Sequence, residues 1–377
     1  MKISVIGTGM TKFGELWDKS LFDLAQEALK SALENSQIDP EKIDAVFVAN
    51  MLSGNLLDQN HLGPVMTSIL GKNVPAFAIE AACASGGTAT HLAIQSLLAG
   101  TYKNVLVVGI EKMTDDTIAD VTTGLMGAAS EEERSAGLTF PGLYAMLANA
   151  HMQKFKTTGK QLALVAVKNH FNGSLNPNAQ FQNKITIEKV LGSTMVANPL
   201  TLFDCSPITD GAAAIVISSQ DSPDNPSITG SAVATDHISI SNRLSMTELL
   251  ATKLSAQKAY AQAGISAKDI DVAEVHDCFT IAEILAYEDL GFCAKGQGGK
   301  LISSGATQLD GKIPVNTSGG LKACGHPVGA TGIKQIIEVT DQLKGKAGKR
   351  QVKNAKIGLT HNVGGSGATA AVHILQI

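Results

Sequence analysis

A cysteine stands where an apolar segment gives way to a helical pattern, in the stretch 81–88 with the sequence AACASGGT. If Cys83 opens that helix, the positive end of the helix dipole favours its thiolate, and a thiolate can attack a carbonyl carbon. Gly86 and Gly87 leave room for another segment to approach closely. A buried cysteine that only packs is the alternative, so the rest of the chain has to decide between the two.

A histidine motif later in the chain offers the base that a nucleophilic thiol needs. His326 lies between Gly325 and Pro327, which predicts a helix entrance with the imidazole directed outward. A histidine close to a cysteine can take the thiol proton. For this motif alone, a histidine that solvates a turn is the alternative.

The segment 274–279, EVHDCF, adds a further histidine and a second thiol at the end of a predicted strand. His276 and Cys278 alternate with Asp277, so both side chains point to one side if the strand continues that far. Ligand crevices form at such strand ends in open α/β sheets. A zinc site on the His-x-Cys pair is the rival, but no C-x-x-C or H-x-x-x-H partner accompanies it, and no metal is predicted.

A glycine-rich turn completes the set of chemical motifs. The segment 361–367, HNVGGSG, follows a predicted strand at 355–360, and its flexible backbone can turn amide N–H groups toward an oxyanion. An ordinary tight turn is the alternative. The similar turn at 316–320, NTSGG, is expected to support the loop of His326.

The elements that must position these residues alternate between strands and helices. A β-branched run at 3–9 is followed by a helical pattern at 20–36 and by strands at 44–50 and 104–109. The last of these is almost pure valine and leucine, which is typical of a sheet covered on both faces. The pattern predicts a layered α/β core.

A change of pattern marks residues 113–203 as an inserted, helix-rich loop region, with helical segments at 143–155 and 160–171. Such regions usually carry substrate contacts. A core strand returns at 213–217, and the Ser, Pro and Asp residues of 221–227 indicate a boundary between two halves.

The second half repeats the first. Residues 265–272 match residues 38–45 at a constant offset of 227, each after an alanine-rich helix and before a strand. Residues 326–331, which begin with His326, can likewise be aligned with residues 83–88, which begin with Cys83. If a pseudo-twofold axis relates the halves, these two residues begin equivalent helices and can face each other.

Composition limits the partners and the compartment. The 377 residues carry a net charge of −4 without a long basic run, so neither nucleic acid nor an anionic membrane is expected as a partner. No membrane span, signal sequence or peroxisomal address is found. Five cysteines without a C-x-x-C pair predict reduced thiols and a cytoplasmic location. Three of them, Cys205, Cys293 and Cys324, are expected to pack.

The motifs resemble the thiolase superfamily, and within it the sterol carrier protein-x thiolase type. They occur in family order at 82–86, 276–279, 319–332 and 361–364. The resemblance implies an α/β thiolase fold of two duplicated βαβαβαββ-type halves, residues 1–222 and 223–377, with a loop domain inserted at about 113–203. It also leads us to expect that the lipid-carrier domain of some relatives is absent.

The resemblance assigns roles to three groups. Cys83 resembles the nucleophile that takes the acyl group, and His326 resembles the base that activates it. Cys278 resembles the second acid/base. Most thiolases carry that second cysteine in the C-terminal glycine-rich loop, where this chain has His361.

Two oxyanion holes are implied in the same way. His276 and His326 would hold the thioester oxygen in one of them. The backbone amide of Cys83, with an amide from the loop around Val363 or Gly364, would form the other.

The implied enzyme is a CoA-dependent acyltransferase, an acetyl-CoA acetyltransferase or 3-ketoacyl-CoA thiolase of lipid and fatty acid metabolism. It would condense and thiolytically cleave 3-oxoacyl-CoA, acetoacetyl-CoA or longer, through an acyl-Cys83 intermediate. Acetyl-CoA, 3-oxoacyl-CoA and CoA are the expected substrates, without a tightly bound cofactor. The CoA contacts are unassigned, although Lys154, Lys156 and Lys168 could meet phosphates.

The resemblance also implies a homodimer or homotetramer, and in archaeal relatives a complex with a hydroxymethylglutaryl-CoA synthase. Two alternatives stay open. A ketoacyl-synthase or acyltransferase-like condensing enzyme would not need the second cysteine. A non-catalytic acyl-CoA-binding subunit of a larger complex would bind CoA without becoming acylated.

Overall fold

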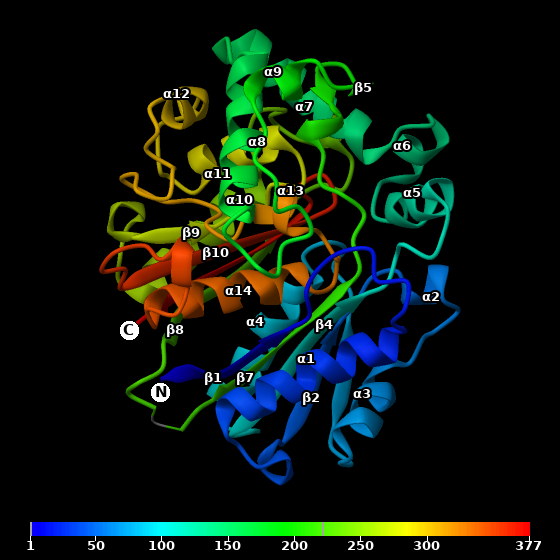
Figure 1. The fold of residues 1–377 in the computed structure, drawn as a ribbon, viewed down its shortest axis with the longest axis vertical. Coiled ribbons are helices and arrows are strands. Elements are labelled where there is room, and N and C mark those ends of the chain that lie inside the picture. The colour runs from blue at the N-terminus through cyan, green and yellow to red at the C-terminus, as the bar shows by residue number, and fades with distance from the viewer. Residues whose placement is uncertain (1, 221) are drawn as a thin grey trace.

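One large sheet forms the centre of the computed structural model, which describes residues 2–220 and 222–377 (Figure 1). Asp221, in the predicted boundary segment, lies outside the described residues. The strand order is β3-β2-β4-β7-β1-β8-β11-β10-β9. The strands are β1 (Ile3–Met10), β2 (Ala45–Ala49), β3 (Ala76–Ile79), β4 (Asn104–Glu111), β7 (Gly211–Ser218), β8 (Ser227–Thr235), β9 (Val272–Glu274), β10 (Ile357–Gly364) and β11 (Thr369–Gln376).

The sheet consists of two sub-sheets with mirrored strand order. From the seam outward the first runs β1-β7-β4-β2-β3 and the second runs β8-β11-β10-β9. Strands β1 and β8 pair at only two positions, Ile3 with Ile228 and Ser4 with Ser227. Short 3-10 turns at Pro40–Lys42 and Ala267–Asp269 precede β2 and β9 at the predicted offset, which confirms the internal repeat.

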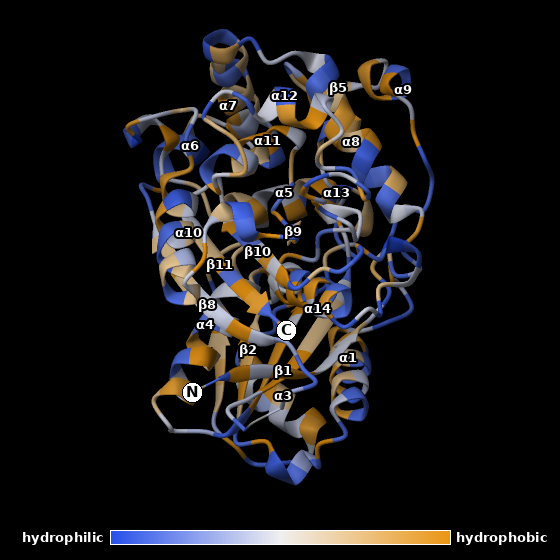
Figure 2. Cartoon of the chain, turned by 90° about the vertical axis from the view of Figure 1, so that its left-hand side faces the viewer, coloured by the Kyte–Doolittle hydropathy of each residue, from blue (hydrophilic) through white to orange (hydrophobic). Residues whose placement is uncertain are grey.

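Helices cover both sub-sheets. Between them lie α4 (Ser85–Leu98) and α14 (Thr331–Leu343), which contact each other and strands of both halves. Helices α1 (Leu21–Ser36) and α3 (Leu62–Leu70) cover the outer face of the first sub-sheet, and α10 (Leu250–Ala263) packs on β8 and β11. Figure 2 shows hydrophobic segments concentrated on the strands and on the helices packed against them. These layers confirm the predicted α/β architecture.

Glycines let the two central helices start against each other. A Cβ on Gly86 would lie 2.9 Å from the carbonyl oxygen of Gly329, and one on Gly332 would lie 2.3 Å from the backbone nitrogen of Gly87. Any side chain at these positions would force the helices apart. The predicted close approach at Gly86 and Gly87 is therefore confirmed, and it brings the loops before α4 and α14 together.

The helix-rich insertion lies between β4 and β7, as predicted, and occupies the upper part of the molecule in Figure 1. It contains α5 (Ile118–Met126), α6 (Glu131–Ser135), α7 (Phe140–Phe155), α8 (Gly159–Gly173), α9 (Ile187–Leu191) and the hairpin of β5 (Met195–Ala197) with β6 (Leu200–Thr201). Three helices of the second half, which the sequence patterns did not predict, pack against α8. They are α11 (Thr280–Asp289), α12 (Gly298–Ser303) and α13 (Gly320–Cys324).

One short helix, α2 (Ser53–Leu56), follows β2. Among the described residues, every helix is too short or too polar to cross a bilayer.

Candidate active site

Cys83 lies two residues before α4, at the end of a tight loop. Ala82 has a φ of 51°, in the left-handed region that side chains other than glycine rarely adopt. The loop is held by Ser85, whose hydroxyl accepts from the backbone N–H of Ala81 at 2.8 Å and donates to the carbonyl of Ala82 at 2.6 Å. This turn fixes the direction of the Cys83 side chain.

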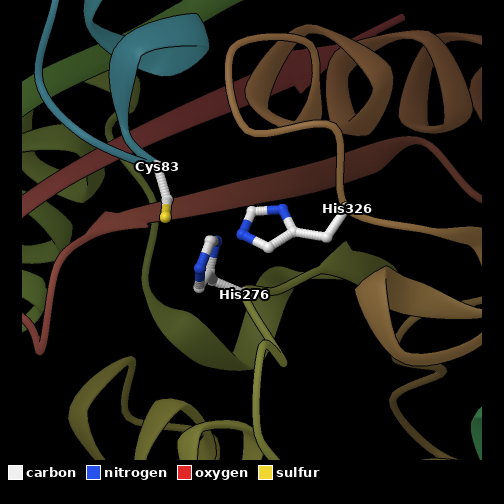
Figure 3. Close-up of side chains that lie close together, drawn as sticks. All are labelled: Cys83, His276 and His326. Atoms are coloured by element: carbon white, nitrogen blue, oxygen red, sulfur yellow. The ribbon is translucent and has the colours of Figure 1, made fainter. Parts of the chain in front are cut away.

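Three predicted residues meet at one point. The sulfur of Cys83 and one ring nitrogen each of His276 and His326 all lie within 4.8 Å of one another (Figure 3). The two imidazole rings meet edge to face, with centroids 5.1 Å apart and an interplanar angle of 84°. The pseudo-twofold arrangement thus places a thiol from the first half opposite two imidazoles from the second half.

The helices after Cys83 and His326 do not begin at equivalent positions, which corrects one expectation. Helix α4 begins at Ser85, whereas α14 begins only at Thr331, five residues after the histidine. The backbone of His326 is instead held by Thr209, whose hydroxyl accepts from the histidine N–H at 3.0 Å. An extended loop rather than a helix terminus therefore carries the imidazole to the thiol.

Hydrogen bonds hold the imidazole ring of His326 in place. The hydroxyl of Thr331 lies 2.9 Å from the carbonyl oxygen of Pro327, which can only accept, and 2.7 Å from Nδ1 of His326. When the hydroxyl gives its one proton to the carbonyl, Nδ1 carries the ring proton and donates to Thr331, which is the tautomer that a base at Nε2 requires. The Nε2 lone pair is then free and points toward Cys83 (Figure 3).

Asn362 fixes the opposite tautomer of His276. Its Oδ1 accepts from the N–H of Gly87 at 3.0 Å and its Nδ2 donates to the carbonyl of Cys83 at 2.8 Å, so the orientation of the amide is determined. The same Nδ2 lies 3.3 Å from Nδ1 of His276, which must accept. In the neutral ring Nε2 therefore carries the proton, and this buried N–H has no hydrogen-bonding partner among the described residues.

This arrangement bears on the zinc alternative. Zinc binds a histidine through a nitrogen lone pair, but with Nδ1 of His276 accepting from Asn362 the other ring nitrogen carries a proton, so neither nitrogen offers zinc a free lone pair. An unpartnered N–H next to a thiol and a free lone pair is suited to bind an oxyanion. The hydrogen bonds therefore disfavour a metal site at Cys83, His276 and His326.

Both reacting groups are neutral at rest, which corrects the expected thiolate. Burial raises the pKa of Cys83 to about 12; the Glu111 carboxylate acts in the same direction, and the N–H of Gly365 and its own N–H act in the opposite direction. Burial, followed by the charge of Lys334, lowers the pKa of His326 to about 3. Desolvation is the largest effect on the thiol pKa, so the thiolate has to be made by proton transfer during attack.

His276 lies beside the thiol, Cys278 is near enough for Cys83 to affect its pKa, and Asp277 is turned to α13, although β9 already ends before all three. Burial and then the nearby Cys83 raise the pKa of Cys278 well above its ordinary value. Asp277 accepts from the backbone N–H of Leu321 at 2.6 Å at the start of α13. It is a structural residue of the motif.

In β10, successive side chains point to opposite faces, which separates His361 from Asn362. Nε2 of His361 lies 2.8 Å from the hydroxyl of Thr252 on α10, away from the thiol. Asn362, which the sequence motif contained but which we did not assign, enters the site instead. Strict alternation along β10 is the signal that could have found it.

The glycine-rich hairpin approaches the cysteine loop closely. A Cβ on Gly364 would lie 2.4 Å from the carbonyl oxygen of Ala81. The amide that faces the Cys83 thiol is that of Gly365, one residue beyond the predicted Val363 and Gly364.

Two other residues near the thiol were missed. Glu111 ends β4 and accepts from the backbone N–H groups of Leu52 at 2.9 Å and Gly329 at 2.9 Å, so it joins loops of the two halves. A single acidic residue at the end of an apolar strand was its only signal. Tyr144 on α7 is fully buried beside Cys278 and carried no signal in the sequence.

Two supporting assignments change. Lys168, a candidate for phosphate binding, is buried and pairs with Glu283 at 2.6 Å, so it is not available for CoA. Lys154 and Lys156 are exposed and stay candidates. Asn316 of the 316–320 turn accepts from the N–H of Val275 at 2.8 Å, so this turn supports the His276 segment directly.

Comparisons with known proteins agree with this geometry. The model described as "Thiolase, N-terminal domain" matches residues 3–221, and "Thiolase C-terminal domain-like" matches residues 232–377. The chain is 48% identical to an acetyl-CoA acetyltransferase of Methanothermobacter thermautotrophicus over 99% of both chains. It is 35% identical to sterol carrier protein 2 of Homo sapiens over 97% of this chain and 70% of that protein.

Two solved structures share the fold over the whole chain. The Ltp2-ChsH2(DUF35) aldolase has a TM-score of 0.85 at 24% identity, over 97% of its chain. Human mitochondrial 3-ketoacyl-CoA thiolase has a TM-score of 0.77 at 20% identity, over 98% of its chain. These likenesses confirm the predicted thiolase fold.

The fold and the similar proteins together identify this protein as an acyltransferase. The chain belongs to the thiolase family, and it is a CoA-dependent thiolase. The comparisons do not favour the ketoacyl-synthase or the non-catalytic alternative.

Proposed function

We propose that the protein is an acetyl-CoA acetyltransferase that joins two acetyl groups into acetoacetyl-CoA and cleaves acetoacetyl-CoA in the reverse direction. The acetyl specificity is supported by the 48% identical relative. The observation that carries the chemistry is the arrangement of a thiol, a free lone pair on His326 and an unpartnered N–H on His276 within 4.8 Å.

In the cleavage direction, we propose that the Cys83 proton passes to Nε2 of His326 while the sulfur attacks the 3-oxo carbon. The carbon–carbon bond then breaks, the acyl group stays on the sulfur, and acetyl-CoA leaves as an enolate. His326 now carries a proton on Nε2 and, with Nε2–H of His276, donates to the enolate oxygen. Removing one donor of this kind raises the barrier by about 3–4 kcal/mol.

The second thiol completes the reaction. Cys278 gives its proton to the enolate carbon. The thiol of free CoA then gives its proton to the Cys278 thiolate and attacks the acyl carbon, and the sulfur of Cys83 leaves and takes its proton back from His326. In synthesis Cys278 removes the α-proton of acetyl-CoA instead. The carbonyl oxygen of acyl-Cys83 would lie in the second oxyanion hole, formed by the Cys83 amide with one from residues 363–365. The amide of Gly365 is the one that acts on the sulfur of the free thiol.

We also propose a homodimer that uses the edge strand β3. Phe77 on this strand is 45% exposed, and Leu92 of α4 is 43% exposed, so an apolar surface accompanies an unpaired sheet edge. From the sequence we propose three further properties: two halves of residues 1–222 and 223–377, a cytoplasmic location, and a partner similar to hydroxymethylglutaryl-CoA synthase.

The test of the chemistry is enzymatic. Wild-type protein should remove the magnesium–acetoacetyl-CoA absorbance when CoA is added, and mass spectrometry should find an acetyl group on the intact protein after acetoacetyl-CoA alone. Cys83→Ala should lose both signals. Cys293→Ala, at a half-buried thiol outside the site, should keep both. Activity or acetylation that survives in Cys83→Ala would refute the nucleophile assignment.

A further inference from the structure

An asparagine of the inserted region contacts the reactive segment, residues 276–278. Asn169 on α8 is fully buried, and its Nδ2 donates to Oδ2 of Asp277 at 2.6 Å and to Oε2 of Glu283 at 2.7 Å. Ionised carboxylates only accept hydrogen bonds, so the nitrogen of the amide faces them and the oxygen does not. The amide thus gives both of its protons to two buried carboxylates.

The oxygen of the same amide is left without a hydrogen bond. Oδ1 of Asn169 is buried and has no partner among the described residues. An unpaired buried acceptor is unfavourable, and an apolar side chain of the same shape would avoid this cost. Packing alone therefore does not explain an asparagine at this position, and the two bonds from Nδ2 have to outweigh the unpaired oxygen.

Asp277 stands in the chain between the two reactive side chains and is held by N–H donors. Its Oδ1 accepts from the backbone N–H of Leu321 at 2.6 Å, and its Oδ2 accepts from that of Lys322 at 3.2 Å. Among the described residues, Asn169 supplies the one side-chain donor to this carboxylate. Burial and then the charge of Glu283 raise the pKa of Asp277, so the carboxylate depends on these donors.

Glu283 is the firmly anchored end of this bridge. Lys168, next to Asn169 on α8, pairs with Glu283 at 2.6 Å, and Nδ2 of Asn316 donates to it at 2.6 Å. Oδ1 of Asn316 accepts from the N–H of Val275, immediately before the reactive segment. Helix α8 is therefore fixed to α11 at Glu283, and Asn169 extends this connection to the reactive segment.

We propose that Asn169 is a positioning residue, whose amide connects Asp277 to Glu283 and so fixes the reactive segment. The place of this segment sets where the Nε2–H of His276 and the thiol of Cys278 lie relative to the nucleophile. The inference rests on the proposed roles of those two side chains. A displacement of about 1 Å at reacting groups can lower a rate about 100-fold, so a bond behind the segment can control turnover.

The experiment compares Asn169→Leu with Asn172→Leu. Both asparagines are buried on α8, and in both the amide oxygen has no partner among the described residues. Nδ2 of Asn172 donates to the backbone carbonyl of Asn316 at 3.0 Å and not to a carboxylate. The control therefore removes a buried amide from the same helix without removing a bond to Asp277.

Turnover and the reactivity of the nucleophile are measured together. Asn169→Leu should lower kcat for thiolysis of acetoacetyl-CoA roughly 10- to 100-fold with the KM for CoA unchanged, whereas Asn172→Leu should stay close to wild type. Iodoacetamide should alkylate Cys83 at the wild-type rate in both variants, because other loops hold Cys83 and His326. Equal losses of kcat in the two variants, or alkylation slowed as strongly as turnover, would overturn the proposal.

A double-mutant cycle with Asp277→Asn tests whether the two positions act together. This substitution keeps the size of the side chain and removes the charge that Asn169 binds. If Asn169 acts through the carboxylate, Asn169→Leu should lower kcat much less in the Asp277→Asn protein than in wild type. Equal fold losses in the two backgrounds contradict the proposal.

The double variant also keeps the test decisive if Asn169→Leu does not fold. It buries one charge fewer than Asn169→Leu and is compared with Asp277→Asn alone. Equal kcat values support the proposal, and a further loss in the double variant contradicts it.

Cys278→Ser separates this inference from the proposed function. If this variant keeps full activity, the acid/base role of Cys278 is wrong. A coupling between positions 169 and 277 in the cycle would then still show that Asn169 positions the segment of His276, and no coupling would overturn that as well.

Discussion

Replacing Asn362 by Asp tests the tautomer that the structure assigns to His276. The change keeps the size of the side chain but replaces its N–H donor by a carboxylate oxygen. Nδ1 of His276 now lies 3.3 Å from the position of an acceptor instead of a donor, so its proton should move from Nε2 to Nδ1. The first oxyanion hole then loses its permanent N–H.

The size of the effect follows from the loss of one oxyanion-hole donor. Such a loss lowers kcat by about 10²–10³ in acyl-transfer enzymes, and the KM for CoA should change little because the affected N–H meets only the developing charge. The same substitution should also create a binding site for zinc. With free lone pairs on both imidazoles and a carboxylate behind His276, Cys83, His276 and His326 become a zinc site within the 4.8 Å triangle.

The assay measures thiolysis of acetoacetyl-CoA at several buffered zinc concentrations. Asn362→Asp should have the lowered kcat and should be inhibited at roughly 10-fold lower zinc than wild type. Asn35→Asp on α1 is the matched control. In the wild-type protein Oδ1 of Asn35 accepts from the N–H of Thr8 at 3.1 Å, and a carboxylate at this position can still accept that bond. A lowered kcat without zinc sensitivity would mean that the change only disrupts the loop, and an unchanged kcat would refute the tautomer argument.

Two further predictions concern stability. Burial lowers the pKa of His326, His361 and His373 to about 3 each, below the value of about 6.5 in the unfolded chain. Between these pH values the unfolded chain binds more protons than the folded protein. The folded protein therefore loses stability as the pH falls from about 6.5 toward 3. Each histidine should contribute about 1.4 kcal/mol per pH unit, and His361→Gln should flatten the slope measured by denaturant unfolding; a slope equal to that of wild type would contradict this cause. The Cβ of Gly332→Ala would meet a backbone nitrogen at 2.3 Å, so this change should lower the free energy of unfolding by about 2 kcal/mol or more. The control is Gly142→Ala on α7, where the nearest neighbour of the Cβ lies at 3.7 Å. This change should leave the free energy of unfolding unchanged or raise it by up to about 1 kcal/mol. Equal melting temperatures for the two alanine variants would show that the central helices can separate without cost.

Local patterns in the sequence were enough to predict many of the helices and strands and the main reactive side chains. Hydrophobic periodicity predicted β1, α1, β2, β4 and two helices of the insertion, α7 and α8, because each pattern reports which side of a single element is buried. The repeat at an offset of 227 predicted the two related halves. The motifs around Cys83, His276 and His326 predicted three groups that the structure brings within 4.8 Å.

The state of those groups could not be predicted, because it depends on burial and on partners far away in the chain. A cysteine before a helix suggested a thiolate, but enclosure by both halves keeps Cys83 a thiol. Lys168 was expected at the surface, but its partner Glu283 comes from the second half.

The sequence by itself therefore determined the fold class, the family and the chemical types of the reacting side chains, since these follow from residues close together in the chain. Only the tertiary structure decided which proton each group carries and which neighbours direct it. Asn362 and Asn169 show the reason: each acts through a contact with residues more than 80 positions away, and no pattern within one element records such a contact.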